Sequence, residues 1–386
     1  MTASTPGPTA PTPDPDLLYS EDEDALRAAV RALLTARSDA PTVIAGLETD
    51  APYDSALWRA LATDIGAAGL LVPEKLGGQG ASAREAAVVL EELGRFVTPV
   101  PYLTSGVLAV TALLGCDTAQ EDVATLLGAL AEGRTVGVLA LPLPTAPGAV
   151  PEATVRAEAD GALTGRVTSV ADAAAADVLL VLAQGPDGPA LHAVEAGAEG
   201  VRTEPVTSLD LTRRLGHLAF EGARGRLLAT GDRARAAVEH AVLTGAGLLA
   251  SEQLGVAEWC LNETVRYTAE RTQFGRPVGS FQALKHRMAA LWLEVASARA
   301  AARNAADALA GDGPDAAVAV AVAQAYCAPV AVRAAEECVQ LHGGIGMTWE
   351  HPAHLFLKRA KSDEVALGTP GRHRDGLAEL VGLSAP

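Results

Sequence analysis

The chain has 386 residues, more than one compact core accommodates, so two or three domains are expected. Its formal net charge of -17 argues against a nucleic-acid partner, because binding a phosphate backbone requires a basic face. Hydrophobic residues make up 49% of the chain but aromatic residues only 4%, so Ala, Val and Leu on closely packed elements must fill the core. This composition favours helices.

The first residues, Met1 to Asp16, are rich in Pro, Thr and Ala and lack the basic and apolar regions of a signal peptide. We therefore predict a disordered tail over residues 1–18. The four cysteines are widely spaced, which favours a reducing cytoplasm over a disulfide framework or a zinc site. No stretch reaches the roughly 18 uninterrupted apolar residues of a membrane span, so no membrane association is predicted.

A helical first domain is predicted over residues 19–133, because apolar residues recur there every three or four positions. Pro73 and the glycines of segment 77–80 interrupt this pattern and indicate a loop. Ser82, with Glu85 three residues later, has the pattern of a capping box and predicts the start of the next helix.

The pattern changes over residues 134–230, where a small β domain is predicted. Short apolar runs at 136–141, 178–183 and 191–194 are separated there by Pro, Gly and Asp, which is typical of strands joined by turns.

Long helical periodicity returns over residues 231–386, which predicts a C-terminal bundle. The whole chain is therefore expected to be an α+β protein, mainly α, with a helical domain, a β domain and a four-helix bundle in that order. The predicted bundle helices cover residues 235–270, 281–309, 316–342 and 351–361.

Three segments resemble the acyl-CoA dehydrogenase flavoprotein family, whose domain order is the same. Residues 271–282 read R-T-Q-F-G-R-P-V-G-S-F-Q, similar to the family's R-x-x-F-G-x-x-I/V-G-x-F-Q. Residues 340–346 read Q-L-H-G-G-I-G, similar to its Q-x-x-G-G-x-G loop. Residues 69–94 resemble the family's first domain, and together the similarities extend over nearly all of the chain after the tail.

The resemblance implies FAD bound at a subunit interface. Residues matching Arg271 and Gln282 contact its pyrophosphate and adenosine end, and the Gln340 to Gly344 loop holds that end from the neighbouring subunit. Arginine offers a charged fork to phosphate, and glycine lets the backbone approach closely. Alone, either segment is more often an ordinary helix end, but their combination and spacing favour a flavin site. The expected cofactor residues are Arg271, Phe274, Gln282, Gln340, Gly343, Gly344 and Thr369.

The resemblance fails at the catalytic base. Family members remove the α proton of an acyl-CoA with a Glu, while the β hydrogen leaves as hydride to the flavin. In most members this Glu lies in a Y-E-G-T segment, which aligns here with Ala366 to Thr369. Leu367 takes the place of the base, and a hydrocarbon side chain accepts no proton.

Other family members carry the Glu on the first bundle helix, where this chain reads Leu243 to Gly247, without a carboxylate. The nearest replacements are Glu239 and Glu364, whose ordinary interpretations are an exposed helix face and a solvated helix end. The backbone N–H of Leu367 remains, and in the family this group polarises the thioester carbonyl. An acyl thioester could therefore bind without reacting.

The middle domain also departs from the family pattern. The family's T-E-P-x-x-G-S-D segment, which contacts the flavin ring and substrate, corresponds to Leu139 to Val150. Its W-I-T-N strand corresponds to Val167 to Val170, and neither segment keeps the tryptophan or the acidic pair. His351 and His354 lie three apart near a helix start, but the sequence indicates no third ligand nearby, so no metal site is predicted.

The favoured hypothesis is a subunit that completes a shared FAD site in a heteromeric acyl-CoA dehydrogenase. A homologous partner, in a dimer or tetramer, carries the Glu, the flavin-ring contacts and the acyl pocket. Electron-transfer flavoprotein or another acceptor then reoxidises the flavin. The alternatives are a self-sufficient homo-oligomeric dehydrogenase whose displaced base is Glu364 or Glu239, and a binding subunit or flavoenzyme of the same fold with another role.

Overall fold

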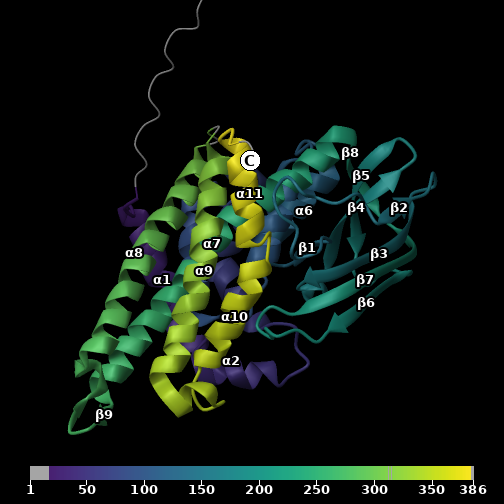
Figure 1. Cartoon of the computed structure of the whole chain (residues 1–386). Helices are drawn as coiled ribbons and strands as arrows, with labels where there is room; N and C mark the ends of the chain where they lie inside the picture. Colours follow the sequence, from purple (N-terminus) through teal and green to yellow (C-terminus); the bar gives the residue numbers. More distant parts are fainter. Residues whose placement is uncertain (1–16, 312, 314, 384–386) are drawn as a thin grey trace, which may run out of the picture.

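The computed structural model describes residues 17–311, 313 and 315–383 (Figure 1). Helices come first, strands follow and long helices end the chain, so the predicted order of elements is confirmed. The predicted tail lies outside the described residues except for Leu17 and Leu18. These two belong to the fold, because their carbonyls accept hydrogen bonds from Arg303 at 2.9 Å and Arg84 at 2.8 Å.

The first helices form where the periodicity predicts them. Ser82 caps its helix as expected: its Oγ accepts from the Arg84 amide at 3.1 Å, and the Glu85 carboxylate accepts from the Ser82 amide at 2.9 Å. The α-helices of this region are α1 (Glu21–Arg37), α2 (Ala40–Leu47), α3 (Ser55–Arg59), α4 (Ala83–Phe96), α5 (Val110–Leu114) and α6 (Glu121–Ala131).

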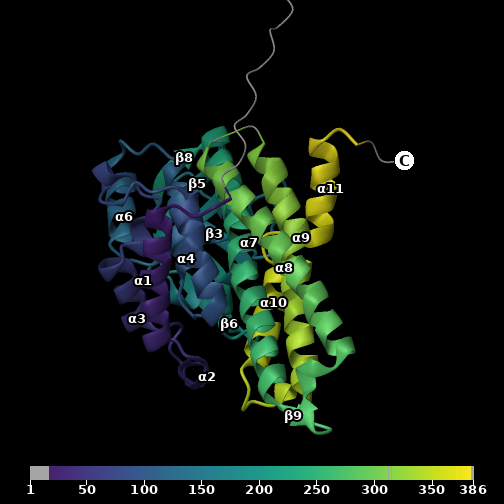
Figure 2. The same cartoon turned by 90° about the vertical axis from the view of Figure 1, so that its left-hand side faces the viewer.

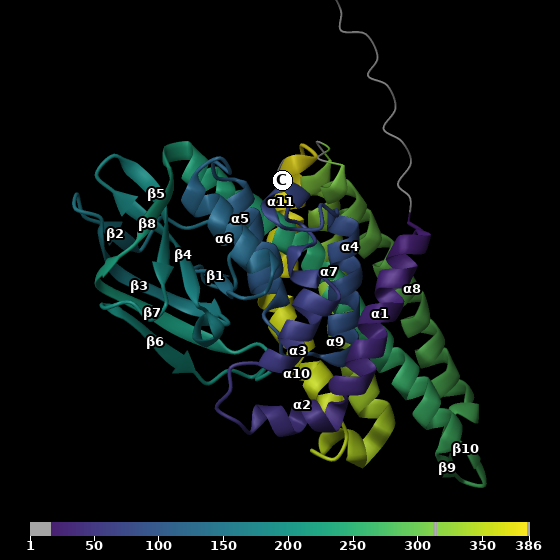
Figure 3. The same ribbon diagram turned by 180° about the vertical axis from the view of Figure 1, so that it is seen from behind.

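The strands of the middle region form one sheet beside the helices (Figures 1 and 3). Their order is β6-β7-β3-β2-β4-β5-β8, and β1 pairs with β4. The apolar runs correspond to β1, β4 and β5. They did not indicate β3 and β7, where buried and exposed residues alternate. The strands are β1 (Gly137–Leu139), β2 (Val155–Ala157), β3 (Ala162–Ala171), β4 (Val178–Gly185), β5 (Gly188–Glu195), β6 (Val201–Val206), β7 (Leu215–Arg224) and β8 (Arg226–Thr230).

The C-terminal bundle contains the four predicted helices and one more. They are α7 (Gly231–Glu270), α8 (Gln282–Ala310), α9 (Ala316–His342), α10 (Ala353–Val365) and the additional α11 (Pro370–Leu380). A short hairpin of β9 (Thr272–Gln273) and β10 (Arg276–Pro277) joins α7 to α8. Figures 1 and 2 place this hairpin and α11 at opposite ends of the bundle.

Helix α9 is long and apolar enough, by length and composition, to cross a membrane. It nevertheless packs against α7, α8, α10 and α11, and 56% of its most apolar window is buried in this structure. Such burial is what a central helix of a bundle requires.

A buried charge network joins the sheet to the bundle. Arg213, in the connection between β6 and β7, donates to Glu252 of α7 at 2.7 Å and to Asp363 of α10 at 2.6 Å. Arg359 of α10 donates to Glu252 at 2.5 Å and to Asp210 at 2.8 Å. Buried charges are tolerated only when paired, so this network holds α10 and the turn that follows it in register with the sheet.

Helices α4 and α7 cross at two glycines. A Cβ on Gly94 would lie 2.1 Å from the Glu252 carbonyl oxygen, and one on Gly255 would lie 1.9 Å from the Glu91 carbonyl oxygen. Both obstacles are backbone atoms, so a methyl group at either position forces the helices apart. The close packing of α4 against α7 therefore depends on glycine at both positions.

We expect Gly255→Ala to lower the free energy of unfolding by about 1 to 3 kcal/mol, because a methyl group overpacks this crossing. The matched control is Gly376→Ala in α11, where nothing lies within 4 Å of the added Cβ. That change is expected to raise stability by up to about 1 kcal/mol, since alanine favours helix. The urea-unfolding midpoints of the two variants measure these changes in stability. Equal changes in Gly255→Ala and Gly376→Ala would contradict the close crossing of α4 and α7.

Candidate functional site

Leu367 lies in the turn between α10 and α11, in a left-handed conformation with φ 52° and with 1% of its surface exposed. Its backbone N–H donates to the Leu143 carbonyl oxygen at 2.7 Å. Its own carbonyl is 2.9 Å from Nε2 of His373. The expectation that this N–H remains available to a thioester is wrong, because the donor already has a backbone partner.

Leu143 connects the sheet to this turn. Its N–H donates to the Ser169 carbonyl at 3.0 Å, while its carbonyl accepts from Leu367. Ser169 belongs to β3, and Leu143 belongs to the segment that the family resemblance assigns to flavin-ring and substrate contacts. The loop is thus bonded on both sides and closes the space between sheet and turn.

The two segments that the resemblance assigns to the base, 243–247 with Gly245 at its centre and 366–369, lie next to each other. A Cβ built on Gly245 of α7 would be 3.1 Å from Cδ1 of Leu367 and 2.4 Å from Cδ2 of Leu108, a residue of the π-helical segment Tyr102–Ala109. Hydrocarbon therefore occupies both positions, and a larger side chain at Gly245 has no room unless Leu108 moves.

The remaining cavity beside Leu367 measures about 20 Å³, which holds about one water molecule. An acyl chain does not fit in it. The lining residues are mostly apolar, and Thr104 among them already donates to Asp172 at 2.8 Å. They are Thr104, Leu108, Leu139, Leu141, Pro142, Leu143, Ala171 and Leu367.

Of the two replacement bases, Glu239 lines a cavity. This cavity, about 620 Å³, lies between α7, α9, α11 and the loop at 146–148, and His373 also lines it. Oε2 of Glu239 accepts from the Gly148 amide at 3.1 Å, and Oε1 lies 3.9 Å from the Arg235 guanidinium. Glu364 instead forms a partly exposed ion pair with Lys361 at 3.6 Å, an ordinary surface contact.

The residues expected at the adenosine end of FAD lie at the hairpin end of the bundle. Arg271 is the C-cap of α7, Phe274 is 89% exposed at the hairpin tip, and Gln282 begins α8. The segment that follows α9 reaches the same end, because the His342 ring stacks on Tyr267 with ring centroids 4.2 Å apart. The predicted cofactor residues here, Gln340 in the last turn of α9 and Gly343 and Gly344 after it, are also exposed.

Thr369 lies apart from this group. It caps α11, with Oγ1 accepting from the Arg372 amide at 3.4 Å, and stands two residues after Leu367. Arg271 follows Gly245 by 26 residues, which corresponds to about 39 Å along a helix axis. Thr369 and the Arg271 segment thus lie toward opposite ends of the bundle.

The adenosine-end residues fit an anionic dinucleotide. Arg271 is exposed, and it forms no ion pair with a carboxylate of the residues that the structure describes. Gly343 has a φ of 64°, and open space surrounds the Cβ positions of Gly343 and Gly344, so a ligand can approach their backbone. At the other end, Leu143 and Leu367 line the cavity of about 20 Å³ between the sheet and the turn after α10.

Sequence reasoning missed Leu143, Leu108 and His373. Each acts on Leu367 or Gly245 through a contact between segments far apart in the chain, and each is an ordinary residue for its own local structure. No local motif marks them.

Two family models of acyl-CoA dehydrogenases match the two helical regions of the chain. The N-terminal domain of acyl-CoA dehydrogenases matches residues 20–134, and the C-terminal domain matches residues 235–382. The acyl-CoA dehydrogenase IpdE2 of Mycobacterium tuberculosis is 37% identical over 350 residues, which cover 91% of this chain and 94% of that protein.

Two solved structures are similar over nearly the whole chain. The ChsE4–ChsE5 complex from Mycobacterium tuberculosis has a TM-score of 0.83 at 29% identity, with 96% of this chain and 100% of that chain covered. A variant of the Tcur3481–Tcur3483 steroid ACAD also has a TM-score of 0.83, at 30% identity, with 94% and 98% covered.

We expect Leu367→Glu to leave the chain without acyl-CoA dehydrogenation, because the cavity has no room for substrate and Leu143 occupies the backbone donor. A carboxyl group buried there has a raised pKa, so its charged form destabilises the fold above the ordinary Glu pKa and the loss disappears below it. Unfolding midpoints from about pH 4 to pH 8, with Leu367→Met as control, measure this. Acyl-CoA-dependent flavin bleaching by the Glu variant would contradict the closed site.

Proposed function

The chain belongs to the acyl-CoA dehydrogenase family of FAD-dependent oxidoreductases, and we propose that it serves as one subunit of a heteromeric member. In this proposal it contributes residues at the adenosine end of FAD to a site shared with a homologous partner. The partner supplies the carboxylate base, the flavin-ring contacts and the acyl pocket. When bound, the flavin accepts the hydride that leaves the β carbon.

The Leu143–Leu367 hydrogen bond carries the proposal. It uses the backbone donor that would polarise a thioester, and it holds two leucines where a substrate and a base would lie. A chain with this arrangement has neither a proton acceptor nor space at its own catalytic position. The proposal therefore assigns catalysis to the other subunit.

The distance between Gly245 and Arg271 along α7 supports a role for Arg271 in a FAD site shared with a neighbouring subunit. Arg271 lies about 39 Å along the helix from Gly245, so its guanidinium is placed for a flavin other than one beside its own Leu367. Arginine suits this task, because its planar fork offers two parallel hydrogen bonds to a phosphate.

Large exposed apolar side chains near the same end are consistent with a subunit contact. Aromatic residues and methionine are enriched in interfaces. They include Phe274 on the hairpin, Trp292 and Leu293 on α8, and Met347 and Trp349 after α9. A dimer or tetramer with a homologous chain would cover them.

The similar proteins suggest the substrate class. One similar structure is described as a complex of two proteins, ChsE4 and ChsE5, and another as a steroid ACAD with a two-part designation. We infer that the complex of this chain acts on a CoA thioester with a steroid-derived acyl group in the cytoplasm. An electron-transfer flavoprotein or another acceptor would then reoxidise its flavin.

The cavity lined by Glu239 favours a second candidate function, a homo-oligomeric dehydrogenase in which this carboxylate is the base. Glu239 lies six residues before Gly245, about 9 Å along the helix axis, so the substrate would have to bind nearer α11 than the resemblance implies. A binding subunit without its own chemistry is the remaining alternative.

The test compares the lone chain with the chain co-expressed with a homologous partner. We expect the lone chain to hold little FAD and the complex to hold flavin that a steroid CoA thioester bleaches without oxygen. Arg271→Gln in this chain should weaken FAD binding by the complex about tenfold or more, because a charged hydrogen bond is lost. Arg202→Gln, at an exposed ion pair of the sheet, is the control and should have no effect.

A lone chain with close to one bleachable FAD per protomer would contradict the heteromeric proposal. Loss of that bleaching in Glu239→Gln, with retention in Glu364→Gln, would then identify the displaced base. A complex that forms without any flavin would instead support the binding-subunit alternative.

A further inference from the structure

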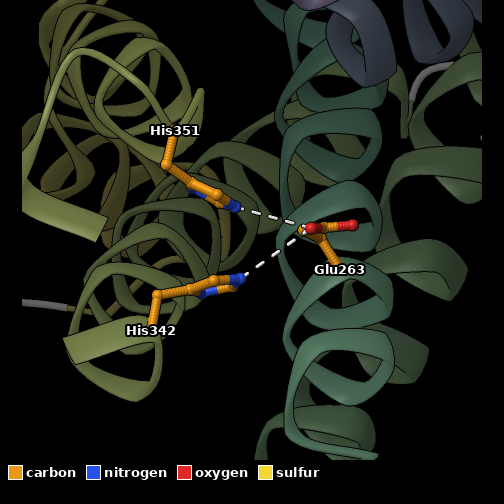
Figure 4. A group of neighbouring side chains, drawn as sticks. All are labelled: Glu263, His342 and His351. Carbon is orange, nitrogen blue, oxygen red and sulfur yellow. Dashed lines mark ion pairs between the residues drawn. The ribbon is translucent and has the colours of Figure 1, made fainter. Parts of the chain in front are cut away.

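Three side chains from separate segments meet near the hairpin end of the bundle (Figure 4). They are Glu263 of α7, His342 in the last turn of α9, and His351 in the connection to α10. Their ligand atoms all lie within 4.8 Å of one another. Oε1 of Glu263 is 3.8 Å from Nε2 of His342 and 3.5 Å from Nε2 of His351.

His342 leaves one buried nitrogen without a partner. Its Nδ1 lies 2.7 Å from the Cys338 carbonyl oxygen and donates to it, which places the lone pair of a neutral ring on Nε2. This Nε2 has no hydrogen-bond partner among the described residues, and the side chain is fully buried. A lone pair that faces a carboxylate oxygen is unfavourable unless positive charge lies between them.

The spacing suits a small cation. A tetrahedral zinc ion with bonds of 2.0–2.2 Å has ligand atoms about 3.4 Å apart. The two distances to Glu263 are 3.5 and 3.8 Å, so shifts of a few tenths of an ångström bring these pairs to that spacing. The two histidine nitrogens lie within 4.8 Å of each other, and they would approach by up to about 1.4 Å when they bind one ion. The Cys338 carbonyl fixes the His342 tautomer, as the second-shell partner of a metal-bound histidine does.

We propose that Glu263, His342 and His351 bind a divalent transition-metal ion of the zinc type. Both histidines coordinate through Nε2 and Glu263 through Oε1, and water completes the coordination. Two imidazoles favour zinc-type ions over Mg²⁺ or Ca²⁺, which prefer oxygen ligands. Glu263 and His351 are 16% and 12% exposed, which leaves a path for the ion.

Two contacts limit the affinity. Arg266 donates to both oxygens of Glu263, at 2.9 Å from Nε and 2.5 Å from its terminal nitrogen, although the carboxylate retains further lone pairs. Nδ1 of His351 accepts from the Ala353 amide at 3.2 Å, and coordination through Nε2 moves the proton to Nδ1, so this contact is lost. We therefore expect micromolar rather than tighter binding.

Protons compete with the metal. Burial by itself lowers the pKa of His342, but its contacts with Cys338 and Glu263 outweigh burial and raise that pKa. Burial and the neighbouring His342 lower the pKa of His351. Coordination requires both rings neutral, so affinity falls as the pH falls through the raised pKa of His342. Arg266, and Tyr267 stacked on His342, also face the cluster.

A bound ion would join α7 to the segment that follows Gly343 and Gly344. This segment begins at the left-handed Gly343 and runs to α10, so an ion held by His342 and His351 restrains both of its sides. The inference does not depend on the proposed function, because it concerns the order of this segment whether or not FAD binds there.

The test titrates the untagged full chain, stripped with a chelator, against Zn²⁺ and Mg²⁺ in competition with a chromophoric chelator. We expect one Zn²⁺ per chain, a weaker affinity at lower pH and no saturable Mg²⁺ binding. Glu263→Gln and His342→Gln should each weaken Zn²⁺ binding at least tenfold. The matched control is His354→Gln, because His354 lies near His351 but outside the cluster, and it should leave Zn²⁺ binding unchanged.

If His342→Gln misfolds, the Glu263→Gln variant still tests the metal site. The amide oxygen of the new Gln side chain can accept from Arg266, so this variant is expected to keep its fold. Binding of Co²⁺ should give visible d–d bands without a thiolate charge-transfer band, and such a band would overturn the ligand set by implicating Cys338. Failure of the native chain to bind Zn²⁺, or equal affinities of Glu263→Gln and His354→Gln, would overturn the metal site and leave a proton-bridged ion pair.

Discussion

The rigid length of α7 is the constraint on which the other features depend. Its 40 residues extend for about 60 Å, and they carry Gly245 toward one end and Glu263 toward the other. A straight helix does not bend to bring its ends to one ligand. The closed turn at Leu367 and the exposed Arg271 segment therefore lie far apart on the helix, and the proposed function assigns the Arg271 segment to a flavin shared with another chain.

The composition of the core explains how α7 packs against its neighbours. Few aromatic residues are available, so the helices approach closely through alanine and glycine, and α4 reaches the α7 backbone at Gly94 and Gly255. Polar links then set orientation where small apolar side chains do not. Glu252 receives two arginines from different elements, and Gln324 donates to the Ala246 carbonyl at 2.6 Å.

The closure at Leu367 follows from the same network. Arg213 and Arg359 hold α10 against the sheet connection, and the turn after α10 then meets the Leu143 loop. Replacement of a base by leucine need not by itself close a site, since a hydrocarbon side chain can line a pocket. Here the Leu143 loop also bonds to the turn, and the cavity left beside Leu367 measures about 20 Å³.

The sequence by itself determined the order of helices and strands, the capping box at Ser82, the Arg271 segment and the absence of a carboxylate at position 367. These features are local, because they depend on periodicity or on residues within one short motif. Its apolar runs did not reveal β7 or the first part of β3, where buried and exposed residues alternate, or α11, which begins at Pro370 with Thr369 as its cap. Only the tertiary structure decided that Leu143 meets Leu367 and that His351 lies beside His342 and Glu263 rather than with His354. Such contacts join segments far apart in the chain, and their geometry depends on how whole helices and sheets pack, which no short stretch of residues encodes.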